Sequence, residues 1–74
     1  MLNIHQDLVS IIMPSYNSEL FIKETINSIL MQSYENWELL ITDDCSIDNT
    51  VSLIEDLMAN ENRIKLFVLT ENSA

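Results

Sequence analysis

The chain has 74 residues, 47% of them hydrophobic, and a formal net charge of −9 from 12 acidic and 3 basic side chains. This hydrophobic content argues against disorder, and the length allows at most one small domain. The scarcity of Lys and Arg argues against nucleic acid as a direct partner, because phosphate contacts depend on them. The single Cys45 cannot form an internal disulfide, and no apolar run suits a membrane span or a signal peptide, so a cytoplasmic setting is expected.

The first predicted element is a strand. Residues 1–8 show no regular pattern, and we expect a flexible lead-in before a domain that comprises residues 9–74. The letters VSIIM at Val9–Met13 are β-branched and apolar, which is typical of a strand buried on both faces. Pro14 is expected to end this strand because proline donates no hydrogen bond to a sheet.

An amphipathic helix is predicted over residues 18–33. Asn17 or Ser18 is expected to cap its start. Its apolar side chains recur at helical spacing and should form one buried face. They are Ile22, Ile26, Ile29 and Leu30.

Two strands and a helix are predicted in the second half of the chain. WELLIT at residues 37–42 is the second strand, and Asp48 is a suitable cap for a helix that runs to about residue 60. Residues 64–69 form the third strand. Strands that alternate with helices indicate an α/β fold with parallel pairing.

Right-handed crossovers predict how these elements are arranged. Both helices then lie on one face of a three-stranded parallel sheet of order 3-2-1, which is half of a doubly wound, Rossmann-like nucleotide-binding sheet. Nothing in this chain covers the opposite face. We therefore expect either self-association through that face or a truncated amino-terminal part of a longer protein, and the ending in ENSA favours the longer protein.

Polar residues gather where the first two strands end. PSYN follows the first strand and DDCSID follows the second, and ligands usually bind at this edge of an α/β sheet. The absence of glycine excludes the dinucleotide fingerprint and the phosphate-binding loop. The remaining oxygens can hydrogen-bond a base and ribose, with Tyr16 as an aromatic wall, or hold a hard cation. A nucleotide that carries its own metal ion is the expected ligand.

The order of these motifs resembles a known family. VSIIMPSYN, a helix that ends in SILMQSY, and WELLITDDCSIDNT together resemble the amino-terminal section of inverting family 2 glycosyltransferases with the GT-A fold. The resemblance implies that this section holds a nucleotide-sugar donor, with a UDP-sugar as the first expectation. It implies that Asp44 accepts hydrogen bonds from the base, with Asp43 as support. The residues expected to bind the nucleotide are Pro14, Ser15, Tyr16, Asn17, Asp43, Asp44 and Ser46.

The resemblance also implies parts that this chain does not contain. The family's metal-binding DXD motif and its catalytic base lie further along, and the adjacent Asp43 and Asp44 do not match the DXD spacing. No catalytic residue and no metal ligand is therefore assigned here, although the parent enzyme is expected to use Mg²⁺ or Mn²⁺. The parent would transfer a sugar to a saccharide or lipid-linked acceptor in cell-surface polysaccharide synthesis, in the cytoplasm or peripherally at the inner membrane face, and this chain alone would be inactive.

Two other classes of function stay open. Two Asp residues after a strand can hold Mg²⁺ in a receiver-like signalling module, but here the pair follows the second strand, and residues 64–69 end without an Asp that could accept phosphate. A non-catalytic structural association module is the other alternative, and the uncovered sheet face would drive its assembly.

Overall fold

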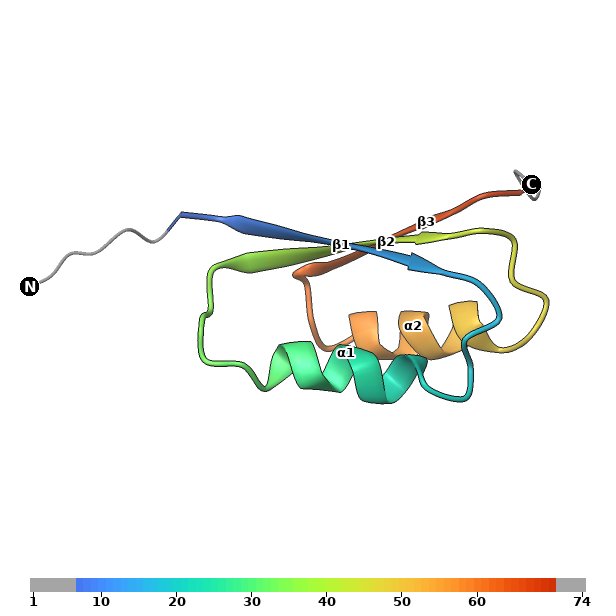
Figure 1. The fold of residues 1–74 in the computed structure, drawn as a ribbon, viewed down its shortest axis with the longest axis horizontal. Helices are drawn as coiled ribbons and strands as arrows, with labels where there is room; N and C mark the ends of the chain where they lie inside the picture. Colours follow the sequence, from blue (N-terminus) through green and yellow to red (C-terminus); the bar gives the residue numbers. More distant parts are fainter. Residues whose placement is uncertain (1–6, 71–74) are drawn as a thin grey trace, which may run out of the picture.

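The computed structural model describes residues 7–70, so most of the expected lead-in and residues 71–74 lie outside the described part. Strands and helices alternate along the chain, as predicted (Figure 1). No helix within the described part is long and apolar enough to cross a membrane. In chain order the elements are β1 (Val9–Ser15), α1 (Ile22–Leu30), β2 (Trp37–Asp43), α2 (Thr50–Met58) and β3 (Ile64–Val68).

The three strands form one parallel sheet in the order β1-β2-β3. This order is the predicted 3-2-1 read from the other edge, and both helices lie on one face of the sheet (Figure 1). The register pairs Ser15 with Asp43, so β1 and β2 end level with each other. The predicted α/β fold class and topology are therefore confirmed.

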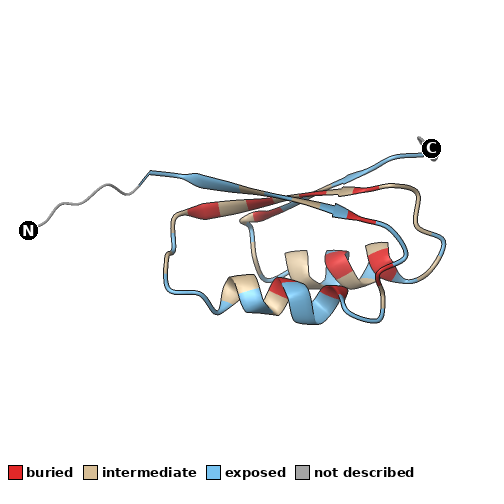
Figure 2. Ribbon diagram, in the orientation of Figure 1, coloured by how far each residue is buried: buried red, intermediate tan, exposed pale blue. Residues whose placement is uncertain are grey.

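The hydrophobic core lies between the sheet and the two helices. Alternate residues of β2 face it, which explains why every second side chain of this strand is buried. In Figure 2 the buried residues lie where the helices and the sheet face each other. The buried apolar side chains are Ile22, Ile26, Trp37, Leu39, Ile41, Ile54 and Ile64.

The structure corrects two predictions for β1. The strand continues through Pro14 to Ser15 instead of ending at Met13. Val9 and Ser15 form backbone hydrogen bonds toward β2. Because the backbone groups of successive residues in a strand point to alternate sides, the Pro14 nitrogen faces the open edge, where no hydrogen-bond donor is needed. The strand is also not buried on both faces, since Ile12 on the face opposite the helices is 68% exposed.

The helices and the other strands differ from the prediction at their ends. The first helix starts at Ile22 rather than at Ser18, because Ser18 lies in a preceding turn whose carbonyl accepts the amides of Phe21 and Ile22. Neither helix has a side-chain hydrogen bond from its own cap residue. The predicted cap by Asn17 or Ser18 is therefore wrong. The second helix starts at Thr50 and ends at 58, β2 extends by one residue to Asp43, and β3 ends one residue early at Val68.

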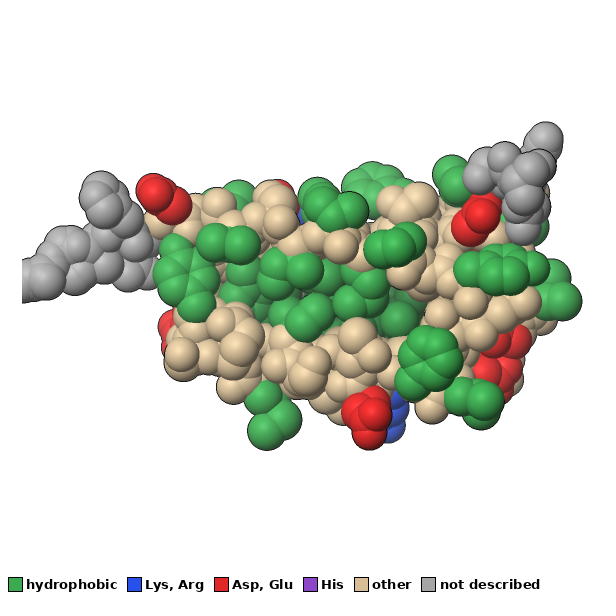
Figure 3. All heavy atoms as spheres, in the orientation of Figure 1, with side chains coloured by type: hydrophobic (Ala, Val, Ile, Leu, Met, Phe, Trp, Pro, Cys, Tyr) green, Lys and Arg blue, Asp and Glu red, His purple; other side chains and the backbone are tan. Residues whose placement is uncertain are grey.

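Apolar surface remains exposed around the sheet. Hydrophobic side chains gather along the seam between β1 and α1, at the β1 edge of the sheet (Figure 3). On the face away from the helices, Ile12 and Phe67 are 68% and 54% exposed. The described residues thus bury one face of the sheet and leave the other face and the two edges, at β1 and β3, open.

Candidate functional site

The carboxyl ends of β1 and β2 form a common rim. Ser15 and Asp43 are paired in the sheet, and the amide of Asp44 donates to the carbonyl of Ser15 at 2.9 Å. Tyr16 and Asp44 are the next residues on the two strands, so both leave the sheet at the same end (Figure 1). The structure therefore brings the predicted tyrosine loop and aspartate turn side by side.

Asp43 is the buried centre of this rim. Its side chain is fully shielded from solvent and accepts the hydroxyl of Ser15 at 2.6 Å, the hydroxyl of Ser46 at 2.6 Å and the amide of Ser46 at 2.8 Å. Burial alone would raise its pKa, but the hydrogen bonds from Ser15 and Ser46 outweigh burial and lower the pKa below the usual value. Asp43 is thus an ionised anchor that ties the end of β1 to the turn after β2.

The two loops are also joined directly to each other. The amide of Asn17 donates to the Ser46 hydroxyl at 2.8 Å, and the amide of Ile47 donates to the Asn17 side-chain carbonyl at 2.9 Å. Each loop contains one residue in the left-handed region, Asn17 with φ 46° and Cys45 with φ 61°. The polar groups of Asn17 and Ser46 therefore serve first to join the loops.

A second set of contacts lies nearer the helices. The amide of Ser18 donates to the buried Thr50 hydroxyl at 2.7 Å, and Thr50 in turn donates to Asp48. Asp48 also accepts the amides of Thr50 and Glu19. Desolvation opposes ionisation of Asp48, but the hydrogen bonds from Thr50 and Glu19 are stronger and lower its pKa. Asp48 therefore accepts the first amide of α2, but the cap residue is Asn49, so the predicted cap lies one residue too early.

The rim residues separate into two groups. Pro14 and Tyr16 are exposed, Tyr16 by 50%, and Asp44 is partly exposed. Ser15 and Asp43 are buried and bonded to each other. Tyr16 and Asp44 are thus more accessible than the buried pair formed by Ser15 and Asp43, which they follow in the chain.

Three residues of the contacts nearer the helices have partners that the sequence analysis did not predict. Ser18 and Thr50 link the two loops, and the Glu19 carboxylate accepts the Asn49 amide at 3.1 Å. The only sequence signal is the concentration of Ser, Thr, Asn and acidic residues in both loops, which does not specify the pairing. Contacts of this kind depend on the loop conformations, which hydrophobic periodicity does not predict.

The described residues do not fit a metal ion. Among residues 7–70, no group of three or more His, Cys, Asp and Glu side chains lies close enough to hold one. The one fully buried carboxylate at the rim, Asp43, already accepts three hydrogen bonds. No chemical step that depends on a metal can be assigned to these residues.

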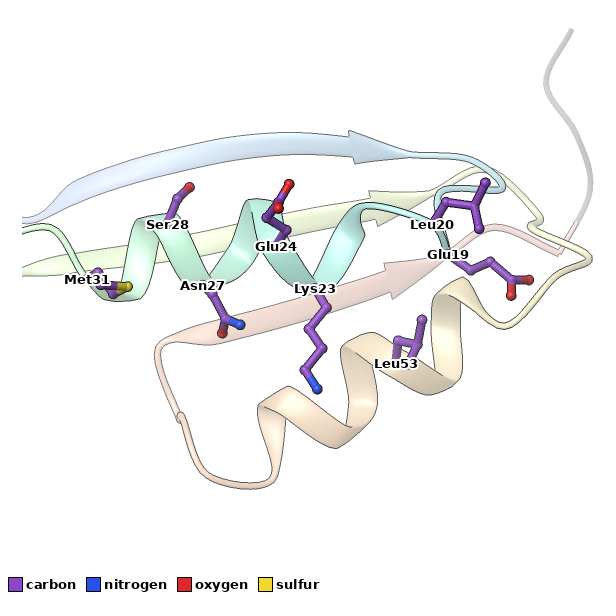
Figure 4. A pocket seen from close by; sticks show the side chains of 8 residues that line it. All are labelled: Glu19, Leu20, Lys23, Glu24, Asn27, Ser28, Met31 and Leu53. Carbon is purple, nitrogen blue, oxygen red and sulfur yellow. The ribbon is translucent and has the colours of Figure 1, made fainter.

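A shallow groove lies elsewhere on the molecule, along α1 (Figure 4). It has a volume of about 580 Å³ and contains none of the predicted site residues. Its polar side chains carry both signs of charge, from Glu19, Lys23 and Glu24. Because none of the residues predicted to bind a nucleotide line this groove, the rim remains the candidate site. The lining residues are Glu19, Leu20, Lys23, Glu24, Asn27, Ser28, Met31 and Leu53.

Comparison with known proteins identifies the family. The sequence model described as "Glycosyl transferase family 2" matches residues 10–74. The chain belongs to glycosyltransferase family 2. A relative from Escherichia coli, "UDP-Glc:alpha-D-GlcNAc-diphosphoundecaprenol beta-1,3-glucosyltransferase WfgD", is 56% identical over 59 residues. The match covers 80% of this chain but only 22% of that relative, so the chain spans about a quarter or less of the length of such glycosyltransferases.

Solved structures of GT-A fold glycosyltransferases show the same arrangement of elements. The structure of S. aureus TarS in complex with UDP-GlcNAc has a TM-score of 0.82 and 36% identity, over 90% of this chain and 20% of TarS. The mannosyltransferase PcManGT from Pyrobaculum calidifontis, in complex with GDP-Man and Mn²⁺, has a TM-score of 0.81 and 27% identity, over 89% of this chain and 20% of its own. This family 2 glycosyltransferase section thus has the GT-A fold that its motifs predict.

Proposed function

We propose that this chain provides the nucleoside seat of a family 2 glycosyltransferase, with a UDP-sugar as the donor. The observation that carries the proposal is the common rim, where the paired ends of β1 and β2 present Tyr16 and Asp44 next to each other. The Tyr16 ring offers a face for the base, and the Asp44 carboxylate offers acceptors for its ring N–H. Uracil carries such an N–H between its two carbonyl groups.

The names of the relatives support a donor and acceptor of this kind. Of the proteins compared above, one has a name that specifies UDP-Glc and a diphosphoundecaprenol acceptor, and another was solved with UDP-GlcNAc. In our proposal the whole transferase passes a sugar to a saccharide or lipid-linked acceptor during synthesis of a surface polysaccharide. It works in the cytoplasm, at the inner face of the membrane when the acceptor is lipid-linked.

The reaction of the whole enzyme is proposed to be inverting. The acceptor hydroxyl would attack the anomeric carbon from the side opposite the departing nucleotide, after a carboxylate base takes its proton. This base, and the residues that hold Mg²⁺ or Mn²⁺, would be other than the residues described here. The role proposed for this chain is to bind and orient the nucleoside.

Titration of the isotopically labelled chain with UDP, followed by NMR, tests the proposal. We expect chemical-shift changes at residues 14–17 and 43–46, with α1 and the groove along it unaffected. A response confined to the groove, or no response to UDP at millimolar concentration, would refute the seat. The same chain mixed with a UDP-sugar, Mn²⁺ and candidate acceptors is expected to transfer no sugar.

Self-association is the second candidate function, and the open sheet face favours it. Parallel sheets normally have both faces covered, whereas Ile12 and Phe67 lie exposed on this face. A second copy that packs its own open face against the first would bury both side chains. This candidate requires no ligand and is tested by the oligomeric state of the chain.

A further inference from the structure

Asn17 joins the β1–α1 loop to the β2–α2 turn through two hydrogen bonds, one as donor and one as acceptor. Its main-chain amide donates to Ser46 Oγ at 2.8 Å, and its side-chain Oδ1 accepts the amide of Ile47 at 2.9 Å. One residue therefore uses both its backbone and its side chain to fix the neighbouring loop.

The residue type suits the backbone at this position. Asn17 has φ 46°, a left-handed conformation that most residues avoid and that asparagine tolerates better than most. An aspartate at this position would keep the acceptor oxygen, whereas a glycine would keep the conformation and lose the acceptor. These two substitutions separate the hydrogen bond from the conformation.

The two neighbours of Tyr16 in the chain are connected by hydrogen bonds to the same carboxylate oxygen of Asp43. Ser15 is bonded to it directly, and Asn17 is connected to it through Ser46. Ser15 Oγ donates to Asp43 Oδ1 at 2.6 Å, and Ser46 Oγ, which accepts the Asn17 amide, donates to the same oxygen at 2.6 Å. Asp44 follows Asp43 directly in the chain. The backbone on both sides of Tyr16 and the backbone before Asp44 are thus fixed to one anchor.

We infer that Asn17 is a positioning residue that completes this network and holds Tyr16 and Asp44 at the rim before any nucleotide binds. The identity of the ligand rests on the proposed function, but the positioning does not. A binding site that is already ordered loses less conformational entropy when a ligand binds. The network around Asn17 therefore increases the affinity for the ligand without contacting it. The Gln32 side chain accepts the amide of Tyr34 at 2.8 Å in the α1–β2 loop, outside the rim, and provides a matched control.

Amide hydrogen exchange on the ligand-free 74-residue chain tests the positioning directly. In Asn17→Gly we expect the Ile47 amide to exchange about tenfold faster than in the wild type, and the Asp44 amide to exchange faster as well. Asn17→Asp keeps the acceptor and should restore the slow exchange. Gln32→Gly should accelerate the Tyr34 amide only. Unchanged Ile47 and Asp44 exchange in Asn17→Gly would overturn the inference.

Binding of UDP to the same variants separates this inference from the proposed function. If the wild-type chain binds UDP, we expect Asn17→Gly to bind about five- to tenfold more weakly and the control Gln32→Gly to bind as the wild type does. Equal affinity of wild type and Asn17→Gly would overturn the positioning role. If the wild type does not bind UDP, the proposed function fails, and the exchange rates still decide whether Asn17 positions the rim.

Discussion

At the scale of single residues, Asp43 has the largest part in shaping the rim. Its carboxylate is fully buried and is compensated by three donors from Ser15 and Ser46 instead of by a cation. A buried charge in this setting is stabilising only while all of its hydrogen bonds are intact. Because Asp44 follows Asp43 directly in the chain, the hydrogen bonds of Asp43 also fix the backbone that leads to Asp44.

Replacing this carboxylate should destabilise the fold. In Asp43→Asn the new NH₂ group faces donors, so we expect the free energy of unfolding at pH 7 to fall by about 1–3 kcal/mol. Asp56→Asn, the same change at an exposed position of α2, should alter it by less than about 0.5 kcal/mol. Urea unfolding followed by circular dichroism measures both, and equal effects would contradict the anchoring role.

The lowered pKa of Asp43 determines in which direction the stability of the fold changes with pH. Because the folded chain binds this proton less tightly than the unfolded chain, Asp43 contributes stability above its usual pKa of 3.8. That contribution is lost as the pH falls through the lower pKa of the folded state. We expect the urea midpoint of the wild type to drop below about pH 4 and that of Asp43→Asn to drop less. Parallel pH profiles of the two proteins would be inconsistent with this expectation.

Cys45 offers a substitution that should stabilise the chain. It has φ 61°, a conformation that costs a residue with a side chain about 1–2 kcal/mol and costs glycine little. Glycine loses more entropy on folding, so Cys45→Gly should raise the free energy of unfolding by about 0.5–1 kcal/mol. Ser52→Gly, within α2, should have the opposite sign. Destabilisation by both changes would show that the backbone at Cys45 is not strained.

At the scale of elements, hydrophobic patterning predicts the existence and order of strands and helices but not their ends. The isoleucines of α1 and the alternation in β2 are strong signals because they reflect burial against a common core. The helix starts depend on loop hydrogen bonds such as that from Ser18 to Thr50, which leave no periodic pattern. The strand ends indicated that both loops lie at one edge of the sheet. The cross-loop pairing of Asn17 with Ser46 leaves no periodic pattern and was visible only in the structure.

The packing of α1 against the sheet depends on a single helical face. Ile26 is completely buried, so Ile26→Ala should lower the free energy of unfolding by about 2–5 kcal/mol through lost burial and a cavity. Leu20, before the helix, is 92% exposed, and Leu20→Ala should change it by less than about 0.5 kcal/mol. Thermal or urea unfolding compares the two. A small effect at Ile26 would mean that α1 is not held by this face.

At the scale of the whole molecule, the chain is a one-sided α/β layer with a polar rim at the end of its strands. Within residues 7–70 the helices leave the opposite face of the sheet open, and apolar side chains are exposed along the seam between β1 and α1 (Figure 3). The rim, by contrast, is internally bonded across both loops. The order within the rim does not depend on a cover for the open face, so nucleoside binding and association can be tested separately.

The candidate association has a direct test in sedimentation velocity. If copies pair through the open face, the wild type should show concentration-dependent assembly, and Ile12→Lys, on the β1 part of that face, should reduce it. Leu20→Lys introduces the same charge at an exposed site outside the sheet and should assemble as the wild type does. A wild type that is monomeric at all concentrations would eliminate this candidate.

The most direct measurement of the nucleoside seat compares the dissociation constants of UDP and CDP for the wild-type chain and for Asp44→Asn. Uracil offers a ring N–H to the Asp44 carboxylate, whereas cytosine has an unprotonated nitrogen at that position. We predict that the wild type binds UDP about tenfold more tightly than CDP and that Asp44→Asn loses most of this preference. Equal affinity of the wild type for both nucleotides, or a preference for UDP that survives in Asp44→Asn, would contradict the assignment of the seat to this rim.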